Sequence, residues 1–182
     1  MNQAIHSVNL LLCLMGPVSE VSAYTAMLAH ERIEVEDVAT ATLRFANGAL
    51  GVIEATTAAF PGSLKRVEIH GSQGSAVLEE ENIKTWHFAK MTKRDEQMLE
   101  RMADRTKTGG GAADPKAIGH HGHARQFQDT FDAIKRGRAP LIDGAEGRRA
   151  VETILAIYQS AATGKPVKLP LTRDFKPKPK GR

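Results

Sequence analysis

The spacing of apolar residues predicts a helix at the start of the chain. The apolar positions follow the i, i+3, i+4 rule of an amphipathic helix, and the glycine and proline at 16–17 end it. The apolar residues are Ile5, Val8, Leu11, Leu12 and Met15. A signal peptide cleaved near residues 21–23 is the alternative interpretation of this stretch. Because no Lys or Arg precedes the apolar run and Glu20 lies just before that site, we favour the helix and expect a cytoplasmic protein.

From residue 18 onward the pattern changes to one typical of β-strands. Residues 38–45 alternate between two faces, and residues 50–57 form the return strand of a hairpin. Between them, Asn47-Gly48 is expected to supply the positive φ angles of a tight turn. Further strands are predicted over 18–28, 64–70, 75–80, 85–88 and 167–169. Because short turns join antiparallel neighbours, we expect a large, mostly antiparallel sheet with helices packed on one face and the other face open.

Helical periodicity returns in the second half of the chain. Residues 123–135 predict an amphipathic helix with Phe127, Phe131 and Ile134 on one stripe. A second helix is predicted over 145–163, ended by Gly164. Its inward-facing residues are expected to be Val151, Ile154, Leu155 and Tyr158. The sequence therefore predicts the α+β fold class.

The domain organisation follows from composition. Residues 1–170 are expected to form one domain, in which 89–118, mostly charged and ending in a glycine run, is a mobile loop with a short helix near 95–105. Residues 171–182 are expected to be a basic disordered tail.

Composition and charge exclude several classes of protein. The chain has 182 residues, 41% hydrophobic and 25% charged, which is a globular composition. Residues 165–182 hold seven basic residues and one acid, a surplus of six, so residues 1–164 contribute −2 to the net charge of +4. A basic tail is a weak signal for nucleic acid, and no apolar run could span a bilayer. We therefore expect no nucleic-acid partner and no membrane. The single cysteine, Cys13, excludes an internal disulfide and a thiolate zinc cluster.

Candidate chemistry is sparse. The Gly71-x-x-Gly74 pair lies in a hairpin turn and the run at 109–111 lacks the lysine of a phosphate-binding loop, so no cofactor site is expected in this chain. The cluster His120, His121 and His123 lacks carboxylate or thiolate ligands at suitable spacing, and no metal is expected. His123 remains a candidate substrate-binding residue facing a pocket.

The first predicted helix carries a polar stripe that is a better candidate. Asn2 and His6 are four residues apart and Asn9 is three further on, so the three share one face. Histidine in such a position is usually structural, and its spacing alone does not assign a role.

Several segments resemble the second domain of the glucose–fructose oxidoreductase / inositol dehydrogenase (Gfo/Idh/MocA) family, in the family's order. Asn2–Leu11 is similar to the helix that opens that domain, and the likeness extends over nearly all of residues 2–170. The other similar segments are Glu36–Ala41 with Phe45–Ala49 (the central hairpin), Ile69–Ser75 (the next turn), and Phe127–Gly137, Asp143-Gly144 and Gly147–Val151 (the closing helices).

The resemblance implies an architecture and a reaction. Family members have a first, Rossmann domain that binds NAD or NADP and carries a catalytic lysine, and both are missing here. The second domain supplies the substrate wall, and its open sheet face commonly forms the oligomer interface. The family's catalytic Asp and His match Asn2 and His6, so His6 would accept a proton from a substrate hydroxyl. Asn2 could hydrogen-bond a hydroxyl without holding a charge, and Asn9, which replaces a frequent Asp, is a substrate-binding candidate.

Two hypotheses follow. The first is that the chain is the substrate-binding and oligomerisation domain of an NAD(P)-dependent oxidoreductase that acts on a sugar, polyol or related hydroxyl compound. Such a domain is expected to be inactive alone. Its partners are expected to be copies of itself or a separate Rossmann-domain chain. NAD or NADP is then expected only with that Rossmann domain. The alternative is a free-standing, non-catalytic binding or scaffold protein derived from such a domain. A Rossmann domain encoded in frame or next to this reading frame would favour the first.

Overall fold

The computed structural model describes residues 4–80, 82–103 and 121–176. Contacts along the chain divide it into two compact units. Unit 1 contains the residues up to Phe60 and those from Asp129 onward, and unit 2 contains Pro61–Gln128. The α+β class predicted from the sequence is confirmed, because helices and antiparallel sheets occur together.

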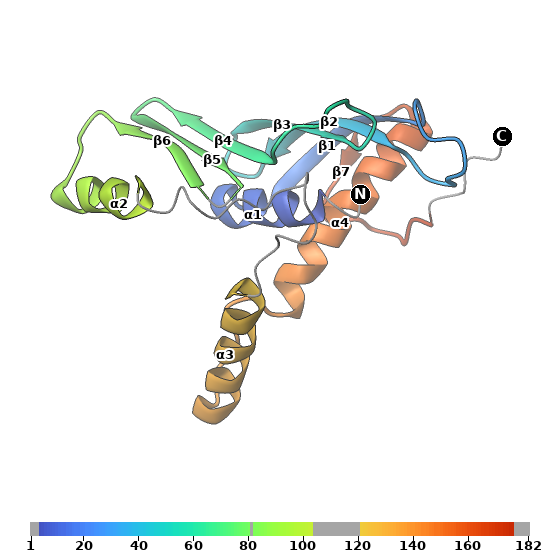
Figure 1. Cartoon of the computed structure of the whole chain (residues 1–182). Helices are drawn as coiled ribbons and strands as arrows, with labels where there is room; N and C mark the ends of the chain where they lie inside the picture. Colours follow the sequence, from blue (N-terminus) through green and yellow to red (C-terminus); the bar gives the residue numbers. More distant parts are fainter. Residues whose placement is uncertain (1–3, 81, 104–120, 177–182) are drawn as a thin grey trace. The chain divides into compact units, whose positions relative to one another are not determined.

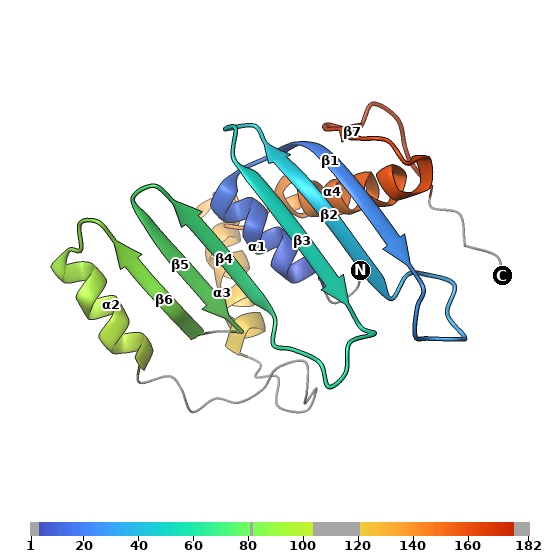
Figure 2. The same ribbon diagram turned by 90° about the horizontal axis from the view of Figure 1, so that it is seen from above.

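Unit 1 is a four-stranded sheet with helices on one side. The strand order is β3-β2-β1-β7, and every neighbouring pair is antiparallel, as Figure 2 shows. Two helices, α1 and α4, lie under the same face of this sheet (Figure 1). The elements are α1 (Ile5–Met15), β1 (Val18–Ala26), β2 (Val38–Phe45), β3 (Leu50–Thr56), α4 (Gly144–Thr163) and β7 (Val167–Lys168).

The core of unit 1 lies between the sheet and the two helices. Along β2 the buried positions alternate strictly with exposed ones, as the period of a half-buried strand requires. Phe45 of β2, Val21 of β1 and Ile157 of α4 are the largest apolar side chains that are fully buried. On the opposite face of the sheet, Leu50 and Val52 of β3 and Tyr24 of β1 are exposed.

The inward face of α4 differs in part from the prediction. Ile154 is buried as expected, but Val151 is largely exposed, so that placement was wrong. Thr153 and Ser160 are buried instead, because their hydroxyls are satisfied. Thr153 donates to the Arg149 carbonyl at 2.9 Å, whereas Ser160 donates to the Lys165 carbonyl at 2.8 Å and accepts from the Ala23 amide at 3.0 Å. Hydroxyls paired in this way enter a core at little cost.

The β2–β3 turn is wider than the sequence suggested. Gly48 has a φ of 88°, but Asn47 is not among the residues with positive φ. The Gly48 amide donates to the Phe45 carbonyl at 3.0 Å and the Phe45 amide to the Ala49 carbonyl at 2.9 Å. The two bonds define a β-turn over residues 45–48 that ends in a left-handed glycine, so only Gly48 has a positive φ and the prediction for Asn47 was wrong.

Unit 2 is a three-stranded antiparallel sheet of order β4-β5-β6 with one helix beside it (Figure 2). Gly74 is required in β5, since a Cβ there would lie 2.2 Å from a ring carbon of Phe88. The Trp86 indole donates to Asp95 at 3.1 Å and ties α2 to β6. The elements are β4 (Arg66–Gly71), β5 (Gly74–Glu79), β6 (Asn82–Phe88) and α2 (Lys93–Ala103).

The helix α3 (His121–Arg136) begins in unit 2 and ends in unit 1. Within the described part of the chain its apolar stripe is exposed, which an ordinary amphipathic helix packed on its own core would not show. The expected loop over 89–118 contains α2, and its remainder from residue 104 lies outside the described residues, as does the tail from 177. Among the described residues, no helix is long and apolar enough to cross a membrane.

Candidate active-site helix

The helix α1 turns one face into the core and presents another to solvent. Val8 and Leu12 are buried, and Ile5 packs against the same core. His6 is exposed. Because side chains four apart lie on one side of a helix and those two apart do not, burial of Val8 and Leu12 directs His6 outward.

The imidazole of His6 has no hydrogen-bond partner among the described residues. None of those residues therefore occupies its ring nitrogens. A neutral imidazole offers one donor and one acceptor, which suits it to exchange a proton with a hydroxyl group. The catalytic role itself stays a prediction.

The polar stripe extends one turn beyond the residues that the sequence singled out. Asn9 is half-buried and follows His6 by three positions, while Asn2 lies outside the described residues. Cys13 is exposed, four residues beyond Asn9, and shares that face. Because Cys13 follows His6 by seven residues and Asn9 by four, its place on this face could have been predicted from the sequence.

Three backbone and side-chain contacts hold the carboxyl end of α1. Gly16, with a φ of 85°, donates its amide to the Leu12 carbonyl at 2.9 Å. The Asn47 side chain donates to the Met15 carbonyl at 3.1 Å, and the Ala46 amide donates to the Pro17 carbonyl at 2.9 Å. The β2–β3 turn therefore fixes the end of the helix that carries His6.

His123 is exposed on α3. It belongs to unit 2, whereas His6 belongs to unit 1. His120 lies outside the described residues. The described residues contain no group of three or more His, Cys, Asp or Glu side chains that could hold a metal ion.

The buried carboxylate of Asp37, in unit 1, has a structural role. Asp37 accepts the backbone amides of Leu28, Ala29 and His30 at 2.8 to 2.9 Å, and the His30 ring lies 3.2 Å away. Hydrogen bonds from the Ala29 and His30 amides are the largest cause that holds the pKa of Asp37 well below its usual range. Since both oxygens are occupied, Asp37 closes the loop between β1 and β2 and is unsuited to proton transfer.

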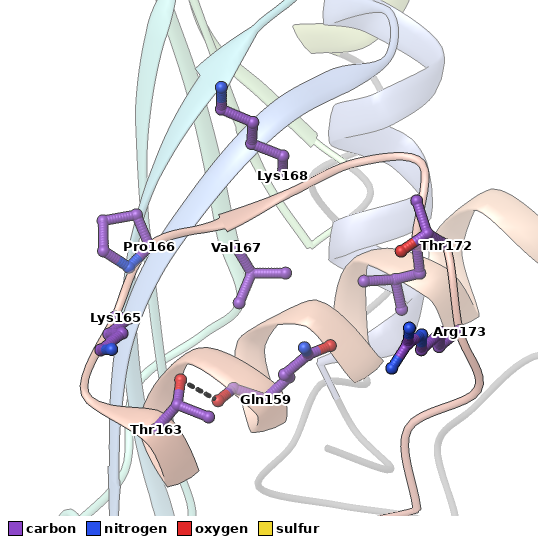
Figure 3. Close-up of a pocket in the computed structure, with 9 residues that line it drawn as sticks. Gln159, Thr163, Lys165, Pro166, Val167, Lys168, Thr172 and Arg173 are labelled. Atoms are coloured by element: carbon purple, nitrogen blue, oxygen red, sulfur yellow. Dashed lines mark hydrogen bonds between the residues drawn. The ribbon is translucent and has the colours of Figure 1, made fainter.

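A recess of about 330 Å³ lies at the end of α4, against β7 and residues 171–173 (Figure 3). Its lining includes three basic residues, Lys165, Lys168 and Arg173, and the Thr163 hydroxyl, which donates to the Gln159 carbonyl at 2.8 Å. None of the residues predicted for the site lines it. Among the described residues, its lining contains no Asp, Glu, His or Cys side chain.

The described residues do not fit a dinucleotide. Such sites need a glycine-rich loop that leads from a strand into a helix, usually in a parallel sheet. Every strand pair here is antiparallel. The connection from β6 to α2, residues 89–92, contains no glycine. Strand and helix order in the described part of the chain therefore provides no phosphate cradle.

A match to a protein-family model decides the family of this chain. A model for the "Oxidoreductase family, C-terminal alpha/beta domain", of the Gfo/Idh/MocA group, matches residues 1–169. The chain belongs to the Gfo/Idh/MocA oxidoreductase family. The resemblance predicted from residues 2–170 is thereby confirmed.

Individual relatives support the same assignment for this Gfo/Idh/MocA chain. The WlbA dehydrogenase from Bordetella pertussis, solved in complex with NADH and UDP-GlcNAcA, is 35% identical with a TM-score of 0.80, over 94% of this chain and 47% of that one. The uncharacterized oxidoreductase YrbE of Bacillus subtilis is 29% identical over 96% of this chain and 49% of its own length. Myo-inositol 2-dehydrogenase of Thermotoga maritima is 27% identical over 93% of this chain and 48% of its own length. The chain thus spans about half the length of these relatives.

Proposed function

We propose that this chain is the substrate-binding and oligomerisation part of an NAD(P)-dependent oxidoreductase that acts on a sugar, polyol or related hydroxyl compound. The observation that carries the proposal is the match to the family's C-terminal domain over residues 1–169, combined with the exposure of His6 on α1. Two matched relatives support the substrate class: one was solved with UDP-GlcNAcA and NADH, and another is a myo-inositol dehydrogenase.

The chemistry proposed for this chain is substrate binding and acceptance of a proton. The exposed imidazole of His6, which has no partner among the residues that the structure describes, can accept the proton of a substrate hydroxyl near neutral pH. Asn9, half-buried on the same face, can hydrogen-bond a neighbouring hydroxyl through its amide. His123, exposed on α3, is proposed as a further substrate contact.

The nicotinamide cofactor is proposed to bind outside this chain. The described residues do not fit a dinucleotide, and the relatives extend over about twice the matched length. We therefore expect this chain alone to be inactive in oxidation of sugars or polyols. Its partner would be a Rossmann domain on the same or on a separate chain.

Calorimetry on this chain tests the proposal in two parts. Titration with UDP-GlcNAcA and with myo-inositol is expected to show one-to-one binding of at least one of them. Titration with NADH and NADPH is expected to show no binding tighter than about 10 μM. A single NADH or NADPH site of that affinity would contradict the proposal that the cofactor binds outside this chain. Failure of both polyhydroxyl ligands would instead favour the non-catalytic scaffold.

A further inference from the structure

Three polar side chains lie in one row across the sheet of unit 2. In register, Ser75 of β5 lies opposite His70 of β4 on one side and opposite His87 of β6 on the other. Directly opposite residues of antiparallel strands point to the same face of a sheet, with Cβ atoms about 4.5–5.5 Å apart. The strand order β4-β5-β6 therefore places a hydroxyl between two imidazoles (Figure 2). We call these three residues the Ser75 row.

The Ser75 row is open to solvent in the described part of unit 2. His70 and His87 are exposed, and Ser75 is half-buried. Trp86 precedes His87 in β6 and so points to the opposite face, where its indole donates to Asp95 of α2 at 3.1 Å. The helix α2 is therefore tied to the other face of this sheet, and the imidazoles of the Ser75 row are accessible to a small molecule.

Hydrogen bonds link the Ser75 hydroxyl to a base, and that base to a carboxylate. Oγ of Ser75 lies 2.9 Å from Nδ1 of His70, and Nε2 of the same ring lies 3.2 Å from a carboxylate oxygen of Glu68. Because a carboxylate only accepts, Nε2 carries the proton in the neutral imidazole, and Nδ1 accepts the hydroxyl proton of Ser75. The other Glu68 oxygen accepts from Nε of Arg66 at 2.7 Å, which fixes the carboxylate. A hydroxyl, a base and a group that orients the base, in this order, form the arrangement that activates a nucleophile.

We propose that Ser75 is a nucleophile for acyl transfer from small, activated carboxylic esters, a function separate from the proposed oxidoreductase role. His70 is its general base, and Glu68 is a positioning residue that fixes the tautomer of His70. His87, on the other side of Ser75, would donate an N–H to the carbonyl oxygen that becomes negative in the reaction. The side chains of Glu68 and His70 are 42% and 62% exposed, so little protein surrounds the acyl group, and the ester is expected to be small with a good leaving group.

The reaction has two balanced steps. In the first, Oγ of Ser75 bonds to the ester carbonyl carbon while its proton moves to Nδ1 of His70, and the bond from that carbon to the alcohol oxygen breaks. The alcohol leaves with the proton from His70. In the second, water gives one proton to His70 and bonds through its oxygen to the same carbon, and Oγ leaves and regains the proton. The sum is ester and water giving acid and alcohol, with no oxidation or reduction.

The probe for the test is 4-nitrophenyl acetate, added to the full chain near neutral pH and quenched with acid. The parent is expected to release 4-nitrophenolate and to carry an acetyl group on Ser75, located by mass spectrometry of its peptides. His70→Gln is expected to form this acetyl group at least tenfold more slowly, since general-base catalysis contributes about 10²–10⁴-fold. Ser75→Ala is expected to carry no acetyl group at that position. Ser72→Ala, in the turn of the same hairpin, is the matched control and is expected to react within about twofold of the parent.

Further variants test the roles of Glu68 and His87. Glu68→Ala is expected to slow acetylation of Ser75, and Glu68→Gln, whose amide oxygen can still accept from Nε2, is expected to recover part of the rate. His87→Ala is expected to be at least tenfold slower than the parent. Equal rates for the two Glu68 variants would reject the positioning role, and a parent-like rate for His87→Ala would reject the oxyanion role.

Three results would overturn the acyl-transfer proposal as a whole. They are no acetyl group on Ser75 of the parent, equal rates for the parent and His70→Gln, and an equal loss of rate in Ser72→Ala. Urea denaturation of each variant shows whether it is folded, and the peptide map of the parent decides the first result without any variant. Ligand titrations at α1 are independent of these results, so the proposed function stands or falls separately.

Discussion

The side-chain amide of Asn47 donates to the main-chain carbonyl of Met15 at 3.1 Å, across 32 residues of sequence. The same side chain accepts the Ala49 amide at 3.0 Å within its own turn. Asn47 thus serves the β2–β3 turn and the carboxyl end of α1 together. Because helix ends leave carbonyls without partners, this contact stabilises the helix that carries His6.

Substitution of Asn47 separates its two contacts. In Asn47→Asp the acceptor for Ala49 is kept, but the donor to Met15 is lost and a negative charge is placed at a helix carboxyl end. We expect the free energy of unfolding to fall by about 0.5–1.5 kcal/mol, measured by urea denaturation. Asn47→Ala, which loses both contacts, is the comparison and is expected to be at least as destabilising. Parent-like stability of the Asp variant would show that the Met15 contact contributes nothing.

The Asp37 carboxylate makes stability depend on acid pH. Its pKa in the folded chain is depressed by the Ala29 and His30 amides, so its stabilisation is present above the unfolded pKa of about 3.9 and is lost as pH falls toward the folded value. We expect Asp37→Asn to be less stable than the parent at pH 7, and the difference to shrink below about pH 4. Urea denaturation at several pH values measures this. Glu34→Gln, an exposed acid in the same loop, is the control and should show no such trend; a pH-independent gap for Asp37→Asn would contradict the assignment.

His6→Ala is expected to separate ligand binding from folding. Because His6 is exposed and unpartnered within the described residues, its removal should change the free energy of unfolding by no more than about 0.5 kcal/mol. The affinity for whichever polyhydroxyl ligand binds the parent is expected to fall at least tenfold. Leu12→Ala, on the buried side of the same helix, is the control for stability and should cost about 2–5 kcal/mol. A large drop in melting temperature for His6→Ala would remove the site assignment.

The open face of the unit 1 sheet is proposed as a homo-oligomer interface. Leu50 and Val52 of β3 and Tyr24 of β1 are each at least 72% exposed there, and large apolar side chains exposed on one sheet face favour association. Light scattering at micromolar concentration is expected to show a mass above the 19.8 kDa of one chain. Val52→Lys should reduce that mass toward the monomer, whereas Leu28→Lys, in an exposed loop, should leave it unchanged. A parent mass of one chain would refute the proposal.

Local patterns determined much of this protein. Strict alternation in residues 38–45 predicted β2 with its correct bounds, because a half-buried strand has a period of two. The apolar spacing of Ile5, Val8 and Leu12 predicted α1, and it placed the polar stripe through His6 on another face, since the helical period assigns each position to a face. The order of several short segments along the chain indicated the family, which the family model then confirmed.

Tertiary structure decided what depends on neighbours distant in sequence. Ser160 was not among the residues predicted to face inward from α4, and it is buried because the Ala23 amide and the Lys165 carbonyl satisfy its hydroxyl. Asn47 was predicted as a turn residue, and only the approach of α1 gave it Met15 as a second partner. Periodicity placed Phe131 on a stripe but could not say which way that stripe faces. The structure shows that the stripe is exposed, whereas Asp129 bonds to Arg138 and the Leu141 amide of the connector that follows α3.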